Sequence, residues 1–191
     1  MKVVCISGRA QHGKDTSAEM MRKYLWGYGK KVLITHYADL LKYICRQFFH
    51  WNGEKDERGR TLLQYVGTDV VRVQRPDFWV KFISDVLDMF DNEWDYVLIP
   101  DCRFPNEVSM LRSRGFDVVH VNVVRDGYDN GLTDEQRSHP SETAMDGIVA
   151  DFIIENNGGL TDLNRAVIQF IQPIYEHEEE RINGSYEYSL A

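Results

Sequence analysis

The sequence predicts an α/β fold in which helices flank a parallel sheet, and three observations indicate it. First, short apolar runs rich in Val and Ile recur along the chain, at residues 3–7, 32–37, 96–100, 117–124 and 151–155. Such runs are typical of strands that are buried on both faces. Second, helical patterns lie between them, as crossover helices between parallel strands do. Third, a glycine-rich turn directly follows the first run, where α/β proteins often bind phosphate.

The helical patterns have recognisable ends. The first helix is expected to begin in the glycine-rich turn and to end at Gly27 and Gly29, and the second begins near Asp39. Residues 51–60 are charged and interrupted by glycine, which predicts a solvated, mobile connection. Thr61 is expected to cap the helix that follows.

Further helices are predicted at about 61–73, at 77–90, and between Pro105 and Gly115. A last helix should begin at Thr161, with Pro173 kinking or shortening it. The polar tail beyond Tyr175 is expected to fray.

Length, charge and cysteine spacing exclude several classes of protein. A chain of 191 residues fits one domain, here residues 1–191. With 30 acidic and 22 basic residues the net charge is −8, which argues against nucleic acid as the main partner. We expect a cytoplasmic protein without a membrane partner, because Met1-Lys2 leads directly into the first strand and no apolar run approaches the roughly 18 residues of a membrane helix. The cysteines at 5, 45 and 102 lack disulfide or zinc spacing.

The glycine-rich turn reads as a phosphate-binding loop for a nucleoside triphosphate. It comprises Gly8, Arg9, Ala10, Gln11, His12, Gly13, Lys14, Asp15 and Thr16. The glycines let successive amide N–H groups converge on an anion, and Lys14 can reach the terminal phosphates. Asp15 stands where Ser or Thr usually follows the lysine, so Asp15 or Thr16 can help to hold Mg²⁺. The alternative is an ordinary strand-to-helix turn.

Two charged residues follow the strand at 96–100. Asp101 is expected at the C-terminal edge of the sheet, where it can orient Mg²⁺ or cap a helix. Arg103 can face a transferred phosphoryl group from the same edge, or form a surface salt bridge.

Residues of the region 38–80 can bind the phosphate acceptor. Asp39 and Lys42 follow the second predicted strand, and Arg72 ends a segment that begins with Gly67. Arginine suits a phosphate monoester because its planar guanidinium donates two parallel hydrogen bonds. Each of them can also be a solvated charge.

The polar stretch 125–146 predicts a lid that contains Arg125 and Arg137. Phosphoryl transfer needs such a lid to screen the reactive phosphate from water. The alternative is a long surface excursion. His139 and Glu142 can be lid contacts, although a helix start at Ser141 explains them as well.

The ordered set of motifs resembles the phage-type deoxynucleoside monophosphate kinases. The motifs are Gly-Lys-Asp-Thr at 13–16, Tyr-Ala-Asp-Leu-Leu-Lys at 37–42, Gly-Thr-Asp-Val-Val-Arg at 67–72, Pro-Asp-Phe-Trp-Val at 76–80, Asp-Cys-Arg-Phe-Pro-Asn-Glu at 101–107, Ser-His-Pro-Ser-Glu at 138–142 and Ala-Asp-Phe-Ile-Ile-Glu-Asn-Asn-Gly at 150–158. The resemblance spans residues 3 to about 171. One departure is Leu40, where the family pattern usually has proline.

This resemblance implies a P-loop kinase fold with a five-stranded parallel sheet and a lid. It implies that ATP and Mg²⁺ donate a phosphoryl group to a deoxynucleoside monophosphate. By matched position, residues 8–16 would bind ATP, and the acceptor would be bound by Asp39, Lys42 and Arg72. Asp101 and Arg103 would face the reaction centre, and Arg125 and Arg137 would belong to the lid. Asn156 would shape the adenine pocket, or is a strand-ending turn residue.

Other functions remain open at this point. A P-loop kinase for another small phosphorylated acceptor, such as dephospho-coenzyme A, would share the core, and a nucleotide-binding regulator would keep the loop without transferring phosphate. A homodimer is possible. Oxidation or alkylation of Cys102, beside Asp101, is expected to block the site.

Overall fold

The protein contains a five-stranded parallel sheet, as predicted. The structure is a computed structural model that describes residues 1–188, with side chains up to Arg181. The strands are β1 (Lys2–Ser7), β2 (Val32–Ile34), β3 (Tyr96–Cys102), β4 (Asp117–Val124) and β5 (Phe152–Glu155). Their order is β2-β3-β1-β4-β5, and every neighbouring pair is parallel. Strand β1 is therefore central, and the loop that follows it opens at the C-terminal edge of the sheet.

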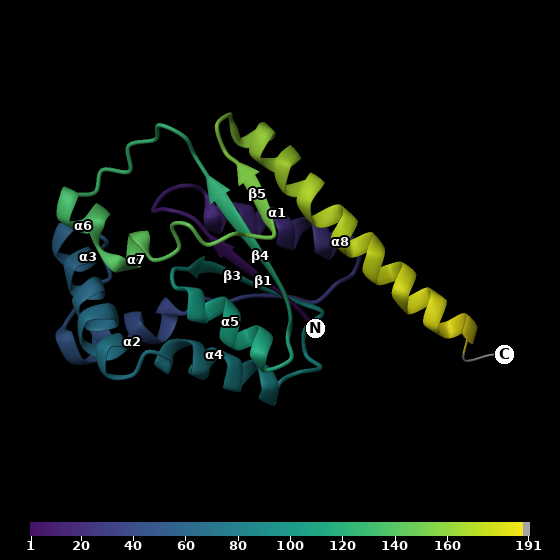
Figure 1. Ribbon diagram of the computed structural model, residues 1–191, viewed down its shortest axis with the longest axis horizontal. Helices are drawn as coiled ribbons and strands as arrows, with labels where there is room; N and C mark the ends of the chain where they lie inside the picture. Colours follow the sequence, from purple (N-terminus) through teal and green to yellow (C-terminus); the bar gives the residue numbers. More distant parts are fainter. Residues whose placement is uncertain (189–191) are drawn as a thin grey trace.

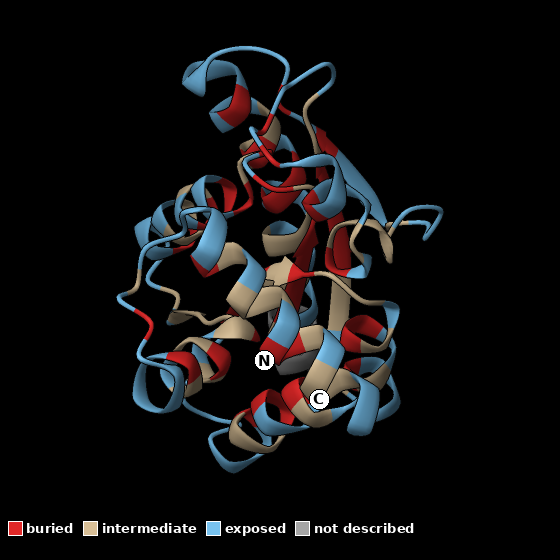
Figure 2. Cartoon of the chain, turned by 90° about the vertical axis from the view of Figure 1, so that its left-hand side faces the viewer, coloured by how far each residue is buried: buried red, intermediate tan, exposed pale blue. Residues whose placement is uncertain are grey.

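Helices cover both faces of this sheet (Figure 1). They are α1 (Lys14–Gly27) and α8 (Leu160–Tyr188) on one face, and α2 (Ala38–Phe49), α4 (Phe78–Met89) and α5 (Pro105–Ser113) on the other. Side chains of a strand alternate between faces, so Val3 and Cys5 pack on one side and Val4 and Ile6 on the other. Figure 2 shows the buried residues concentrated on the strands and on the inward turns of the helices.

The segment after α2 differs from the prediction. Helix α3 (Glu57–Gln64) begins before Thr61, because the Asp56 carboxylate accepts a hydrogen bond from the Gly59 amide at 2.7 Å and caps the helix. Trp51 is buried and its indole N–H donates to the Glu54 carbonyl at 2.9 Å. The connection is thus anchored rather than fully solvated, and Thr61 is not the cap.

A π-helix, η1 (Tyr65–Arg72), continues directly from α3. The predicted helix 61–73 is therefore two elements with different hydrogen-bond patterns. The indole N–H of Trp79 in α4 donates to the Gly67 carbonyl at 3.0 Å, which ties η1 to α4. Leu41 fits against Gly67 so closely that an added Cβ would lie 2.6 Å from its Cδ2.

Helix α8 passes through Pro173, so the prediction that this residue shortens the helix is wrong. The tail beyond Tyr175 is helical up to Tyr188. Glu178 contacts the Lys2 ammonium at 3.2 Å and Glu179 contacts Lys30 at 2.5 Å. These ion pairs hold the tail against the start of β1 and the turn that follows α1.

The polar stretch 125–146 contains α6 (Asp134–Ser138) and α7 (Pro140–Thr143), which Figure 1 shows beside α3 at one end of the molecule. His139 caps α7, because its Nδ1 accepts a hydrogen bond from the Ser141 amide at 3.2 Å. Helix α7 therefore begins one residue before the predicted start at Ser141. Within residues 1–188, no helix has the length and apolar character that a membrane span requires.

Candidate active site

A cavity of about 400 Å³ lies at the C-terminal edge of the sheet, beside the glycine-rich loop. Its walls come from the loop, α2, α3, η1, α4, the end of β3 and the lid. The residues that line it include Lys14, Asp15, His36, Lys42, Lys55, Arg60, Leu63, Gly67, Thr68, Arg72, Trp79, Asp101, Arg103, Phe104, Glu107, Ser141 and Glu142. The sheet order brings these segments together, because β1 lies directly between β3 and β4.

The backbone of the loop requires its two glycines. Gly8 and Gly13 have φ values of 137° and 100°, which L-residues with side chains rarely adopt. A Cβ on Gly8 would lie 2.3 Å from the Val123 carbonyl oxygen, and one on Gly13 would lie 2.7 Å from Asn156 Nδ2. The loop thus has the tight, glycine-dependent geometry that a polyphosphate cradle needs.

Asn156 supports this loop from behind. Its amide Nδ2 donates to the His12 carbonyl at 2.9 Å, and the side chain is buried. The structure therefore places Asn156 against the loop backbone and outside the 400 Å³ cavity. The role in an adenine pocket stays a prediction.

Lys14 is buried at the start of α1. Its ammonium donates to the carbonyls of Gly8 at 2.7 Å and Arg9 at 2.8 Å, so both contacts are with the loop itself. Burial, and then the nearby positive charge of Arg103, lower the pKa of Lys14 to about 8. A negatively charged ligand beside this ammonium would offset both effects.

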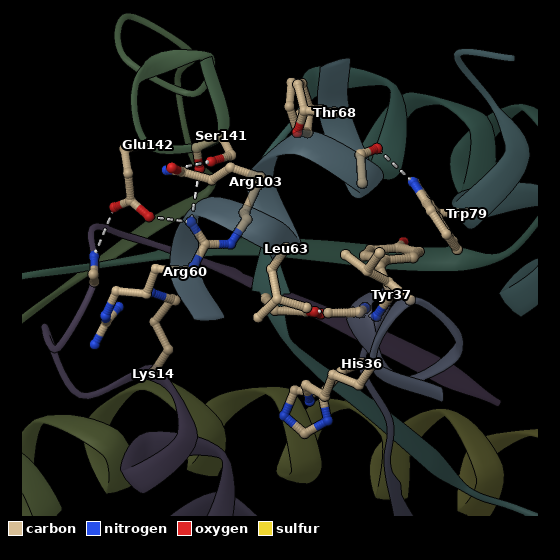
Figure 3. A pocket seen from close by; sticks show the side chains of 18 of the residues that line it. Lys14, His36, Tyr37, Arg60, Leu63, Thr68, Trp79, Arg103, Ser141 and Glu142 are labelled. Carbon is tan, nitrogen blue, oxygen red and sulfur yellow. Dashed lines mark hydrogen bonds and ion pairs between the residues drawn. The ribbon is translucent and has the colours of Figure 1, made fainter. Parts of the chain in front are cut away.

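Arg103 meets the lid at the edge of the cavity (Figure 3). Its guanidinium donates to the Ser141 carbonyl at 2.8 Å and forms an ion pair with Glu142. The other oxygen of Glu142 accepts a hydrogen bond from the Ala10 amide in the loop, at 3.0 Å. The Glu142 side chain is only 5% exposed, and although burial acts to raise its pKa, Arg103 outweighs burial and lowers it. The lid, Arg103 and the loop are thus joined through one charged carboxylate.

Asp101 caps helix α2. Its carboxylate oxygens accept hydrogen bonds from the backbone amides of Tyr37 and Ala38, each at 2.9 Å. This is the capping alternative of the sequence analysis, although the residue also lines the cavity. The cap lies at the start of α2, a few residues after β2 ends at Ile34.

The residues expected to bind magnesium are not gathered into one ligand set. Asp15 accepts a hydrogen bond from His36 Nε2 at 2.9 Å, and this contact lowers the pKa of Asp15 and raises that of His36. Thr16 is exposed and does not line the cavity. Among the residues with described side chains, no group of three or more His, Cys, Asp or Glu is arranged to hold a metal ion. The magnesium roles stay predictions.

Arg72 is engaged by protein groups. Its guanidinium pairs with Glu107 at 2.5 Å, donates to Asn106 Oδ1 at 3.1 Å, and lies 3.8 Å from the centre of the Phe104 ring. Glu107 is buried; burial raises its pKa to about 7, while Arg72 opposes this shift. Arg72 therefore lines the cavity with its charge already neutralised when Glu107 is ionised.

The other two acceptor candidates pair with each other. Lys42 contacts Asp39 at 2.9 Å, and Asp39 also accepts a hydrogen bond from the His36 amide at 3.1 Å. Lys42 lines the cavity, whereas Asp39 does not. Asp39 thus lies in the first turn of α2, outside the cavity, where it contacts Lys42 and the His36 amide.

The lid arginines lie away from the cavity. Arg125 stacks on Tyr128 at 3.9 Å, and Arg137 pairs with Asp134 at 3.0 Å with its side chain 45% exposed. Neither lines the cavity. In this arrangement the lid contributes Glu142 rather than an arginine.

Sequence reasoning missed several cavity residues. Lys55 and Arg60 come from the segment that was expected to be solvated, and Trp79 and Thr68 form the far end. The helix cap at Asp56 is the local feature that could have indicated a fixed segment there. Glu107 belongs to the motif at 101–107 but received no role from the sequence, because its contact is with Arg72, which lies 35 positions away.

Cys102 is not accessible in this arrangement. It is 1% exposed, and burial raises its pKa well above the ordinary value for a thiol. Only an exposed thiolate reacts readily, and Cys102 is neither exposed nor easily ionised. The structure therefore does not favour the hypothesis that modification of Cys102 blocks the site.

Comparison with known proteins identifies the family. The sequence pattern of the deoxynucleotide monophosphate kinases matches residues 34–167. The deoxynucleotide monophosphate kinase of Enterobacteria phage T4 is 36% identical over 107 residues, which cover 54% of this chain and 41% of the phage protein. That of Escherichia phage RB69 is 35% identical over the same length and with the same coverage. The aligned part thus spans about two fifths of these curated relatives.

Among solved structures, a gluconokinase from Sinorhizobium meliloti 1021 superposes with a TM-score of 0.54 at 10% identity, covering 94% of this chain and 97% of the gluconokinase. This likeness concerns the fold alone. Because the family pattern matches well over half of the chain, the protein belongs to the deoxynucleotide monophosphate kinase family.

Proposed function

We propose that the protein transfers the γ-phosphoryl group of ATP to a deoxynucleoside monophosphate, giving ADP and a deoxynucleoside diphosphate. The observation that carries this proposal is the buried Lys14 of a glycine-dependent loop, which lines one cavity together with Arg103. A donor phosphate in the loop and an acceptor in the cavity would then meet beside two positive charges.

The cavity has the polarity that a nucleoside monophosphate requires. Lys14, Arg60 and Arg103 lie on one side and Trp79 lies on the other (Figure 3). A phosphate suits the positive side, and a planar base can pack against an indole ring. The family match supports this choice of acceptor over other small phosphorylated molecules.

The chain's own groups would act mainly by position and charge. Lys14 and Arg103 would neutralise the charge that spreads over the transferred group, and the lid would exclude water. Mg²⁺ neutralises phosphate charge when it is bound, and of the three residues expected to hold it only Asp15 and Asp101 line the cavity. A cytoplasmic location and a homodimer stay predictions.

The test is ADP formation from ATP and Mg²⁺ with a full panel of ribo- and deoxynucleoside monophosphates. We expect deoxynucleoside monophosphates to stimulate ADP release. Lys14→Ala should lower turnover about a thousandfold, because a preorganised charge at the transferred group is lost.

Lys23→Ala is the matched control, because Lys23 is exposed on the same helix, outside the cavity. It should leave turnover unchanged. Dephospho-coenzyme A as the sole acceptor would replace the proposed substrate. ATP binding without acceptor-stimulated ADP release would indicate a regulator.

A further inference from the structure

The positive side chains that line the cavity differ in whether they already have a partner. Lys42 pairs with Asp39, Arg72 with Glu107, and Arg103 with Glu142. Lys14 donates to two carbonyls of its own loop. Lys55 and Arg60 line the same cavity, but within residues 1–181 no side chain forms a hydrogen bond or ion pair with the Lys55 ammonium or the terminal nitrogens of Arg60.

The backbone fixes both residues in place. Arg60 Nε donates to the Lys55 carbonyl at 3.0 Å, which leaves its terminal nitrogens available at the cavity wall. Asp56 caps α3 between them, and Gly59 is buried against Glu54 and Trp51. The backbone of the pair is therefore held by hydrogen bonds, while Lys55 is exposed and Arg60 is half-buried.

Lys55 and Arg60 lie among other positive side chains of the cavity. Burial, and then the repulsion of Lys42, lower the pKa of Lys55, and Arg103 adds to this repulsion. The negative charge of Asp15 acts in the opposite direction and raises the pKa of Lys55. Gathering like charges is unfavourable, so an anionic ligand at this place would be strongly stabilised.

We propose that Lys55 and Arg60, whose cationic nitrogens have no acidic partner among residues 1–181, bind the phosphate of the acceptor. The inference rests on the proposed function and names the residues of its acceptor site. A phosphate monoester can accept two parallel hydrogen bonds from a guanidinium and one from an ammonium. Leu63 and Gly67, further along α3 and η1, line the cavity beyond the pair, so the base would point toward Trp79.

The test compares Lys55→Met and Arg60→Gln with two matched controls. Arg58→Gln changes an exposed arginine of the same helix, and Lys81→Met changes an exposed lysine of α4; neither residue lines the cavity. With ATP saturating, each cavity variant should raise the KM of the acceptor about tenfold or more, as the loss of one charge-assisted hydrogen bond predicts. The KM of ATP should change less than twofold, and both controls should match the unaltered protein.

A second measurement separates this inference from the proposed function. Isothermal titration calorimetry without ATP would follow the binding of the four common deoxynucleoside monophosphates and their parent deoxynucleosides. We expect the cavity variants to weaken monophosphate binding about tenfold and to leave deoxynucleoside binding unchanged.

Equal monophosphate affinity in the variants and the unaltered protein would overturn the inference, as would failure of the unaltered protein to bind any monophosphate. If monophosphates bind through Lys55 and Arg60 but no ADP forms, the inference stands and the proposed function fails.

Discussion

At the residue scale, Lys14 illustrates how burial prepares a charge for an anionic ligand. The ammonium is held by two loop carbonyls in a place where burial and Arg103 both disfavour its charge. Its pKa of about 8 lies below the ordinary value of a lysine. Because the pKa is lowered, the positive form is lost as pH rises through about 8, and the free protein becomes a weaker phosphate binder.

We therefore expect kcat/KM for ATP to fall between pH 7 and pH 9, because this ratio reports the ionisation of the free enzyme. Steady-state rates at fixed ionic strength, with the acceptor held well below its KM, would measure the profile. Lys14→Arg is the control, since a guanidinium stays protonated throughout this range and its lower rate should not show the same fall. A flat profile for the unaltered protein would contradict the assignment.

Glu142 is the second residue whose environment defines a role. It lies in the lid, yet its carboxylate joins Arg103 to the Ala10 amide. We expect Glu142→Gln to lower kcat about ten- to a hundredfold, because Arg103 loses the charge that orients it and small misplacements are costly in phosphoryl transfer.

Glu135→Gln, at an exposed position on α6 of the same lid, should leave kcat unchanged. Thermal melting would show whether Glu142→Gln is folded. An unchanged kcat in a folded Glu142→Gln protein would show that Arg103 does not depend on this contact.

At the element scale, the junction between α2 and α3 determines where the cavity wall stands. Asp56 begins α3, Trp51 anchors the preceding turn, and Gly59 allows them to meet. A Cβ at Gly59 would lie 2.0 Å from the Glu54 carbonyl oxygen and 2.7 Å from Trp51 Nε1. The backbone must shift to accept any larger residue, and Lys55 and Arg60 would shift with it.

Gly59→Ala should therefore lower the free energy of unfolding by about 2 kcal/mol, as overpacking of a well-filled site does. Urea unfolding followed by circular dichroism would measure it. Gly27→Ala is the control, because no atom lies within 4 Å of an added Cβ there and alanine favours the helix. It should be neutral or slightly stabilising. Equal stability of the two variants would show that the junction is not tightly packed.

At the scale of the whole molecule, the sheet order explains why distant segments form one site. β1 lies between β3 and β4, so the glycine-rich loop, the end of β3 and the lid that follows β4 share one edge. Helix α8 covers the same face of the sheet as α1, and its Glu178 forms an ion pair with Lys2 at the start of β1. The site is thus built at the C-terminal edge while the last helix secures the other end of the strands.

The sequence by itself determined the strands, the fold class and the phosphate-binding loop. Each depends on residues close together in the chain: apolar runs for strands, and Gly8 and Gly13 for a backbone that side chains would obstruct. Local patterns therefore suffice to predict them.

Only the tertiary structure decided which charged residues are free to meet a ligand. Arg72 is paired with Glu107, which lies 35 residues away, and Glu142 accepts a hydrogen bond from the Ala10 amide, which lies 132 residues away. Arg125 and Arg137 lie outside the cavity, whereas Lys55 and Arg60 line it. The sequence specifies which side chains can carry a charge, but whether another group already neutralises that charge depends on how segments far apart in the chain pack together.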